Sequence, residues 1–157
     1  MSHLITSQLV AAYQQCPRKA FFLLRGSPEP CPHEYEIVVE ERAANRRLAL
    51  ALEKPVVISA DDLQATCDAL TQGKKRGQRE PHLVIGTETP SPLDKARLAF
   101  AGYVMGGENR RRPAFGVVVG FSGQSKRVKL GPLYASVSKA VDRQREWTGQ
   151  LPSEPPG

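Results

Sequence analysis

The sequence lacks the features that would place the chain in a membrane or in a secretory pathway. Its longest apolar candidate, residues 48–52, ends at two charged residues and is far shorter than the ~18 to 20 residues that a bilayer-spanning helix requires. The amino terminus carries no basic segment followed by a long apolar one, so we expect no cleaved signal peptide. The sequence therefore predicts a cytoplasmic protein without a membrane partner.

Cysteine and aromatic residues are also scarce. Cys16, Cys31 and Cys67 are an odd number of cysteines at spacings of 15 and 36 residues, which fits neither a disulfide framework nor a self-contained tetrahedral zinc site. Aromatic residues make up 6% of the chain, and we expect Phe115 and Phe121 to face the core. A stacking platform for single-stranded nucleic acid is therefore not predicted.

The length and composition favour one compact domain. With 157 residues, of which 40% are hydrophobic and 24% charged, the chain can bury one sizeable core. We place this domain at residues 1–148. Residues 149–157 are rich in proline and glycine and show no periodicity, which predicts a disordered tail.

The positive charge is concentrated in the second half of the chain. Residues 1–72 carry 7 basic and 9 acidic side chains, whereas residues 73–157 carry 15 and 7. This asymmetry indicates a polyanionic partner, most simply nucleic acid bound without sequence specificity, although a solvated surface would give the same count. The candidate contact residues form three clusters: Lys74, Lys75, Arg76 and Arg79; Arg110, Arg111 and Arg112; and Lys126, Arg127 and Lys129.

Hydrophobic periodicity predicts an α/β protein with a small mixed sheet flanked by helices. Apolar residues at helical spacing, with capping and stop signals, predict helices at residues 7–15, 17–26, 34–53, 61–73, 94–105 and 132–147. Short β-branched runs predict strands at residues 55–59, 82–85, 115–121 and 126–130.

Cys16 is the residue most suggestive of a metal or cluster ligand. It precedes Pro17 at the start of a predicted helix, where the helix dipole and the cations Arg18 and Lys19 would stabilise a thiolate. The alternative is a small buried residue at a helix junction. On Cys16 alone, the alternative is favoured.

A wider pattern around Cys16 resembles a known family. The segment ITSQL at residues 5–9 and the segment YQQCPRKAFFL at residues 13–23 resemble the opening of RecB-like nucleases of the PD-(D/E)XK superfamily, which include CRISPR-associated exonucleases and helicase-linked relatives. Residues 94–100, 112–119 and 127–130 follow the order of that family's later helix and hairpin. The resemblance implies a restriction-endonuclease-like core, Mg²⁺ or Mn²⁺ at an active site, and a helicase or nuclease partner.

The resemblance also implies a [4Fe–4S] cluster with Cys16 as one ligand and three more cysteines in a carboxyl-terminal segment. This sequence contains no such cysteine-rich segment, so we expect no complete cluster in this chain by itself. The final residues resemble the stretch that precedes those cysteines. The chain can therefore be a fragment of a longer product.

The sequence departs from the family pattern where the metal ligands are expected. Residues 43–47, AANRR, stand in place of a Gly-x-x-His-Glu motif, and LVI at residues 83–85 replaces a Glu-x-Lys motif. The Asp-bearing hairpin is expected to be deleted between residues 72 and 81. The remaining catalytic candidates, Glu88, Asp94 and Lys95, are weak, because adjacent residues on a helix point about 100° apart and do not converge on one ion.

The leading hypothesis is therefore a degenerate or truncated RecB-like nuclease-family domain that binds nucleic acid and lacks its own metal-dependent activity. The alternatives are an active divalent-metal nuclease and a non-catalytic protein-interaction subunit. The hypothesis predicts that Leu83 and Ile85 are buried on one face of a strand, and that Arg46 and Arg47 point away from them or to solvent. It also places Cys16 close to the final segment of the chain.

Overall fold

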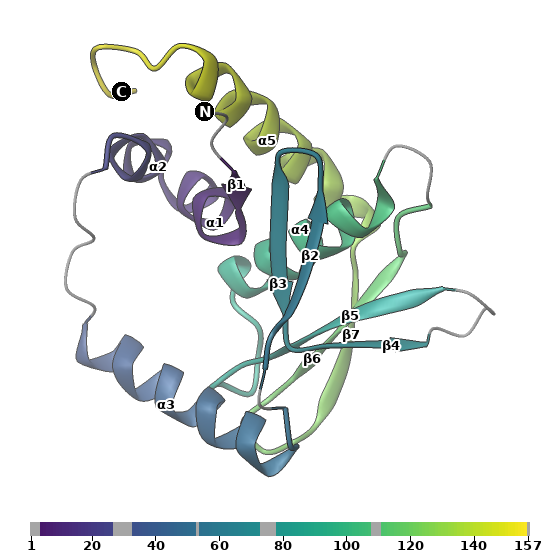
Figure 1. The fold of residues 1–157 in the computed structure, drawn as a ribbon. Coiled ribbons are helices and arrows are strands. Elements are labelled where there is room, and N and C mark those ends of the chain that lie inside the picture. Colours follow the sequence, from purple (N-terminus) through teal and green to yellow (C-terminus); the bar gives the residue numbers. More distant parts are fainter. Residues whose placement is uncertain (1–3, 27–32, 53, 73–77, 108–110, 157) are drawn as a thin grey trace.

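The protein is described by a computed structural model at residues 4–26, 33–52, 54–72, 78–107 and 111–156. These residues form five α-helices and two small mixed sheets of three and four strands (Figure 1). The predicted α/β class is confirmed. The single sheet that we expected is wrong, because the strands divide into two sheets.

The helices begin and end close to the predicted positions. Thr6 accepts a hydrogen bond from the Leu9 amide and caps the first helix, and Pro17 occupies the first position of the second. The helices are α1 (Ser7–Gln15), α2 (Pro17–Leu24), α3 (Glu34–Ala49), α4 (Pro92–Gly106) and α5 (Tyr134–Gly149), with a short 3₁₀ helix, η1 (Gly131–Leu133), before α5. Within the described segments, no helix is both long and apolar enough to cross a membrane.

The two sheets each combine parallel and antiparallel pairs. The first has the order β1-β3-β2 and contains β1 (Ile5–Thr6), β2 (Val56–Ala60) and β3 (Leu63–Cys67). The second has the order β4-β5-β6-β7 and contains β4 (Ala69–Gln72), β5 (Arg79–Val84), β6 (Phe115–Val119) and β7 (Ser125–Lys129). β1 pairs with β3 in parallel, and β5 pairs with β6 in parallel.

The predicted helix at residues 61–73 is wrong, because this segment forms the strands β3 and β4. Leu63, Ala65 and Cys67 are buried and alternate with half-buried polar residues, which is the period of two of a strand. Asp61 has a φ of 51°, in the left-handed region, and makes the turn from β2 into β3. Cys67 consequently lies on a strand and not in a helix.

Helix α4 lies at the centre of the fold. It packs against α1 and α5 and against strands of both sheets, and its apolar side chains Leu98, Phe100 and Val104 belong to the main core. Leu83 and Ile85 are 3% and 4% exposed and join this core, whereas Val84 packs on the opposite face of the second sheet. The predicted burial of Leu83 and Ile85 on one face is confirmed.

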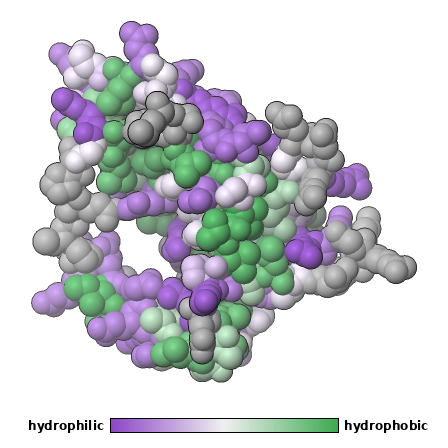
Figure 2. Space-filling view, viewed as in Figure 1, coloured by the Kyte–Doolittle hydropathy of each residue, from purple (hydrophilic) through white to green (hydrophobic). Residues whose placement is uncertain are grey.

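Helix α3 packs less than its sequence pattern predicts. Only Ala43 is buried, while Tyr35 and Leu48 are 70% and 69% exposed. The helix backbone at Val39 approaches Gly86 so closely that a Cβ there would lie 1.8 Å from the Val39 carbonyl oxygen. Figure 2 shows an opening between α3 and the α1–α2 pair, so α3 is attached mainly through its contacts with the second sheet and its loops.

The two ends of the described chain pack together. Trp147 of α5 makes edge contacts with Tyr13 and Phe21, and Leu151 packs against the same cluster. The buried Gln144 donates a hydrogen bond from Nε2 to the Leu9 carbonyl at 2.8 Å. The carboxyl-terminal segment therefore lies beside α2, whose first residue follows Cys16 (Figure 1).

Candidate nucleic-acid interface

The basic side chains proposed from the sequence lie on several elements. Arg79 is exposed on β5, Arg111 and Arg112 are exposed before β6, and all three cations of the last cluster are exposed on β7. Lys74, Lys75, Arg76 and Arg110 lie outside the described residues.

The structure brings two lysines, Lys95 and Lys126, together at one pocket, whereas Arg127 and Lys129 pair with Val117 and Phe115 in the register of the sheet and lie on its other face. Lys95 from α4 and Lys126 from β7 line this open pocket of about 390 Å³, together with residues of the 89–90 turn and η1. Lys95 is one of the weak catalytic candidates named from the sequence, and its side chain is exposed. No local sequence signal relates residue 95 to residues 126–129, because only the packing of α4 against the second sheet brings them close.

The four cations differ in how far they are neutralised. Arg127 donates to Glu80 Oε1 at 2.6 Å, and its guanidinium carbon lies 4.1 Å from the centre of the Phe115 ring. Lys95, Lys126 and Lys129 form no ion pair with any residue that the structure describes. Lys95 and Lys126 at the pocket, and Lys129 on the other face of the edge strand β7, are uncompensated cations that create a local positive potential favouring a polyanion.

A second basic surface lies on the other side of η1. Leu133 lines the lysine pocket, whereas Gly131 and Tyr134 line a larger pocket of about 790 Å³ that also includes Arg111 and Arg112. The two pockets therefore flank the same short helix. Together they form a basic tract from β7 to the residues that precede β6.

The carboxylates of Glu88 and Asp94 are both engaged in local hydrogen bonds. Glu88 accepts from the Ser122 amide and hydroxyl at 2.7 Å each, which ties the loop before α4 to the β6–β7 turn. Asp94 accepts from the Ser91 amide and hydroxyl at 2.9 Å each and completes the capping box of α4. These contacts give both carboxylates a structural role.

The most buried acidic group near the expected catalytic strand is Asp68, which our sequence reasoning missed. Its side chain is 12% exposed, lies at the β3–β4 junction, and accepts a hydrogen bond from the Val84 amide at 2.6 Å. Arg47 Nε lies 3.1 Å from Asp68 Oδ1 without the alignment of a hydrogen bond, so this contact is an ion pair. The expected deletion between residues 72 and 81 stays a prediction, because residues 73–77 lie outside the described residues, but the link between β3 and β4 does carry an aspartate beside β5.

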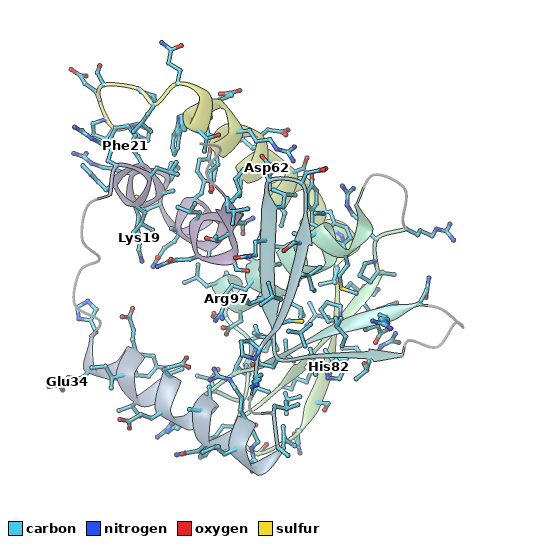
Figure 3. All side chains as sticks on the ribbon, viewed as in Figure 1. Lys19, Phe21, Glu34, Asp62, His82 and Arg97 are labelled. Carbon is cyan, nitrogen blue, oxygen red and sulfur yellow. The ribbon has the colours of Figure 1, made fainter. Side chains whose placement is uncertain are left out.

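The predicted orientation of Arg47, away from Leu83 and Ile85 or to solvent, is wrong, whereas Arg46 turns toward the β6–β7 turn and not toward Leu83. Arg47 reaches the segment of β5 next to Leu83 through its contact with Asp68, and Arg97 of α4 lines the same open pocket of about 210 Å³ (Figure 3). Arg46 donates to the Phe121 carbonyl oxygen at 2.9 Å from Nε. Both guanidiniums lie on the side of α3 that faces the second sheet, because the Phe121 carbonyl and the Asp68 carboxylate are within reach there.

Known proteins provide no further guide to these residues. The chain matches no family model, no curated protein and no solved structure. The resemblance to RecB-like nucleases therefore stays a prediction that depends on the motifs quoted above.

The cysteines described do not fit an iron–sulfur cluster. Cys16 is exposed at the start of α2, as predicted, whereas Cys67 is buried in β3, where burial raises the pKa of its thiol to about 11. Cys31 lies outside the described residues. A [4Fe–4S] cluster needs four thiolate ligands, and the described part of the chain offers one exposed thiol.

The described side chains do not fit a divalent metal site either. Among the described residues, no three His, Cys, Asp or Glu side chains gather as candidate metal ligands. Asp68, beside β5, has Arg47 Nε 3.1 Å from its Oδ1, so a cation of the chain already occupies a position that a metal ion would take. We therefore derive no chemical step through a metal or a cluster.

Proposed function

We propose that this chain binds nucleic acid without sequence specificity, through the basic tract that flanks η1. The clustering of Lys95, Lys126 and Lys129 at and beside the edge strand β7, free of acidic partners among the described residues, carries the proposal. Such lysines contact phosphates and release counterions, and they read no base. The positive charge of the second half of the chain supports the same partner.

We propose in addition that the scaffold is a degenerate RecB-like nuclease domain with a restriction-endonuclease-like core and without metal-dependent phosphodiesterase activity of its own. What supports this is the motif resemblance, the aliphatic Leu83 and Ile85 in place of an acid and a lysine, and the pairing of Asp68 with Arg47. In this function the domain positions a strand, and a helicase or nuclease partner would cut or move it.

The binding test uses fluorescence anisotropy of labelled 20-mer DNA, single-stranded and duplex, in two unrelated sequences over a range of salt. We expect similar affinity for both sequences. The slope of log affinity against log salt should become shallower by about 2 for duplex DNA in the Lys126→Ala/Lys129→Ala variant, since each phosphate contact contributes about 0.9.

The matched control is the Lys54→Ala/Lys139→Ala variant, which removes the same charge from two exposed positions outside the pocket. Its salt slope should stay close to that of the unmodified chain. An equal decrease of the salt slope in both variants would show that the basic tract contributes no more to DNA binding than any other surface charge. Absence of measurable affinity at low ionic strength would refute nucleic-acid binding.

The lack of catalysis is tested by a plasmid-nicking assay with Mg²⁺ or Mn²⁺. We expect no metal-dependent cleavage from the unmodified chain. Cleavage that Asp94→Ala or Asp68→Ala abolishes would establish the active-nuclease alternative.

An interaction subunit that uses the same basic tract for an acidic protein is the second candidate, because the three unpaired lysines would suit that partner as well. Competition between labelled DNA and polyglutamate separates the two. DNA that resists excess polyglutamate supports the nucleic-acid function, and its easy displacement favours the protein partner.

A further inference from the structure

The larger of the two pockets beside η1 has chemistry of its own. Its volume is about 790 Å³, which is within the range of small-ligand sites, and it lies where the β2–β3 turn, the end of α4, the segment before β6 and helix α5 meet. Three guanidiniums line it, from Arg111, Arg112 and Arg145, beside the rings of Tyr103 and Tyr134.

The guanidinium of Arg145 is held in place by an ion pair and forms one side of the pocket. Arg145 of α5 donates to both carboxylate oxygens of Asp62, at 2.8 Å from Nη2 and 3.0 Å from Nε, and Asp62 lies at the tip of the β2–β3 turn beside α5 (Figure 3). This hydrogen bonding with Arg145 lowers the pKa of Asp62, so the pair stays ionised at neutral pH. The pair is neutral as a unit and closes one side of the pocket.

The other two guanidiniums are available to a ligand. The guanidinium carbon of Arg112 lies 4.0 Å from the centre of the Tyr103 ring and 5.8 Å from that of Tyr134, so the rings hold it in place. No described residue accepts a hydrogen bond from Arg112 or from its exposed neighbour Arg111. Their planar N–H forks match the oxygens of a phosphate.

The aromatic wall is itself held rigid. The Tyr134 hydroxyl donates to the Pro113 carbonyl at 2.5 Å, and Tyr103 and Tyr134 lie with ring centres 6.5 Å apart. Because the Arg112 guanidinium covers the face of the Tyr103 ring, a planar base can stack on the outer face of that guanidinium. Gly131 opposite the rings leaves open space, since a Cβ there would meet no atom within 4 Å.

We propose that this pocket binds a phosphate monoester carried by a nucleoside, either a free nucleotide or the phosphorylated end of a strand. A monoester presents up to two charges and three free oxygens, enough for both Arg111 and Arg112, whereas an internal phosphate of a strand presents one charge and two. For the strand end, this inference rests on the proposed nucleic-acid binding. It adds a preference for a terminal phosphate over an internal one, which the lysines of the basic tract do not provide.

Asp61 is an acidic residue of the pocket that, unlike Asp62, has no ion pair with a described residue. Its removal should therefore change phosphate affinity in the direction opposite to the removal of an arginine. Asp61 is exposed at the pocket and repels a phosphate dianion. Asn adopts the left-handed backbone of this turn as well as Asp does, so Asp61→Asn should preserve the fold. The substitution should tighten phosphate binding while loss of an arginine weakens it.

The first experiment measures adenosine 5′-monophosphate and adenosine by calorimetry on the full chain. The nucleotide should bind and adenosine should bind at least about tenfold more weakly, because charged hydrogen bonds to phosphate are lost. Arg111→Ala and Arg112→Lys should each weaken nucleotide binding about tenfold, and Asp61→Asn should strengthen it. Arg143→Ala, on the exposed side of α5, is the charge-matched control and should leave it unchanged.

The second experiment compares 20-mers with and without a 5′-phosphate. Tighter binding of the phosphorylated strand, lost in Gly131→Phe, assigns the strand end as a ligand; equal binding of the two strands with retained nucleotide binding assigns the free nucleotide. Equal binding of both strands together with no preference for the nucleotide over adenosine overturns this inference alone. Failure of every oligonucleotide to bind overturns the proposed function instead, and thermal melting of each variant verifies that the pocket variants remain folded.

Discussion

Replacing Asp68 by alanine should lower the free energy of unfolding by about 1.5 to 4 kcal/mol. The larger part comes from the Val84 amide, which is buried with its residue 3% exposed and would lose its acceptor. An unpaired buried N–H costs about 1 to 3 kcal/mol. The ion pair with Arg47, whose side chain is 26% exposed, adds about 0.5 to 1 kcal/mol after screening by solvent.

Urea unfolding followed by circular dichroism measures this loss. Asp68→Asn keeps an oxygen acceptor for the Val84 amide and should lose only about 1 kcal/mol, mainly the ion pair. Asp142→Ala, which removes an exposed carboxylate from α5, serves as the control and should stay within about 0.5 kcal/mol of the unmodified chain.

The opposite result would identify Asp68 as a functional ligand. A protein whose stability is unchanged or raised by Asp68→Ala, and whose melting temperature rises with Mg²⁺ only while Asp68 is present, would refute the structural role argued for this carboxylate. Metal ligands are often maintained at a cost in stability, whereas a carboxylate that satisfies a buried amide and a guanidinium stabilises the fold.

Three further outcomes follow from single contacts. Gly86→Ala should destabilise the protein by about 1 to 3 kcal/mol and speed hydrogen exchange in α3, since the new Cβ displaces the Val39 carbonyl; unchanged exchange would contradict that contact. Gln144→Met should change the free energy of unfolding by less than about 1 kcal/mol, because removal of Oε1, which is buried without a hydrogen-bond partner among the described residues, offsets loss of the Nε2 hydrogen bond to the Leu9 carbonyl; a loss of about 2 kcal/mol or more in thermal melts would contradict this. Burial lowers the pKa of His82, so stability should be complete above pH 6.5 and fall as the pH drops below it, and His82→Asn should flatten that slope in urea titrations at several pH values.

The sequence predicted the elements whose signals are local. The Cys16–Pro17 junction, the apolar periodicity of residues 94–105 and the β-branched run of β6 each indicate their own structure locally, and the structure has all three as expected. The helix predicted at residues 61–73 is wrong because Asp61 and Asp62 resemble a helix start, whereas the buried residues from Leu63 to Cys67 alternate as they do in a strand. The period of two in that stretch was the available signal.

The sites depend on pairs that are distant in sequence, which explains why only parts of them were predicted. Lys126 and Lys129 were proposed from composition, but Lys95 joins them only through tertiary packing. Asp68 was not recognised because it falls within the helix wrongly predicted at residues 61–73. Its partner Arg47 lies on α3, and the sequence pattern of α3 does not predict which residues that helix contacts. Arg145 was likewise not recognised as part of a pocket with Arg112, since α5 and the segment before β6 meet only in the folded chain.

The joining of the first helix to the last imposes an order on folding during synthesis. Gln144 and Leu9, which share a hydrogen bond, are 135 residues apart, and at the usual elongation rate of 5 to 20 residues per second about 7 to 27 s separate their emergence from the ribosome. Throughout that interval the apolar faces of Tyr13 and Phe21 are without Trp147. The nascent chain consequently exposes the apolar surface of α1 and α2. Chaperone binding to these two helices should end only when α5 has left the exit tunnel.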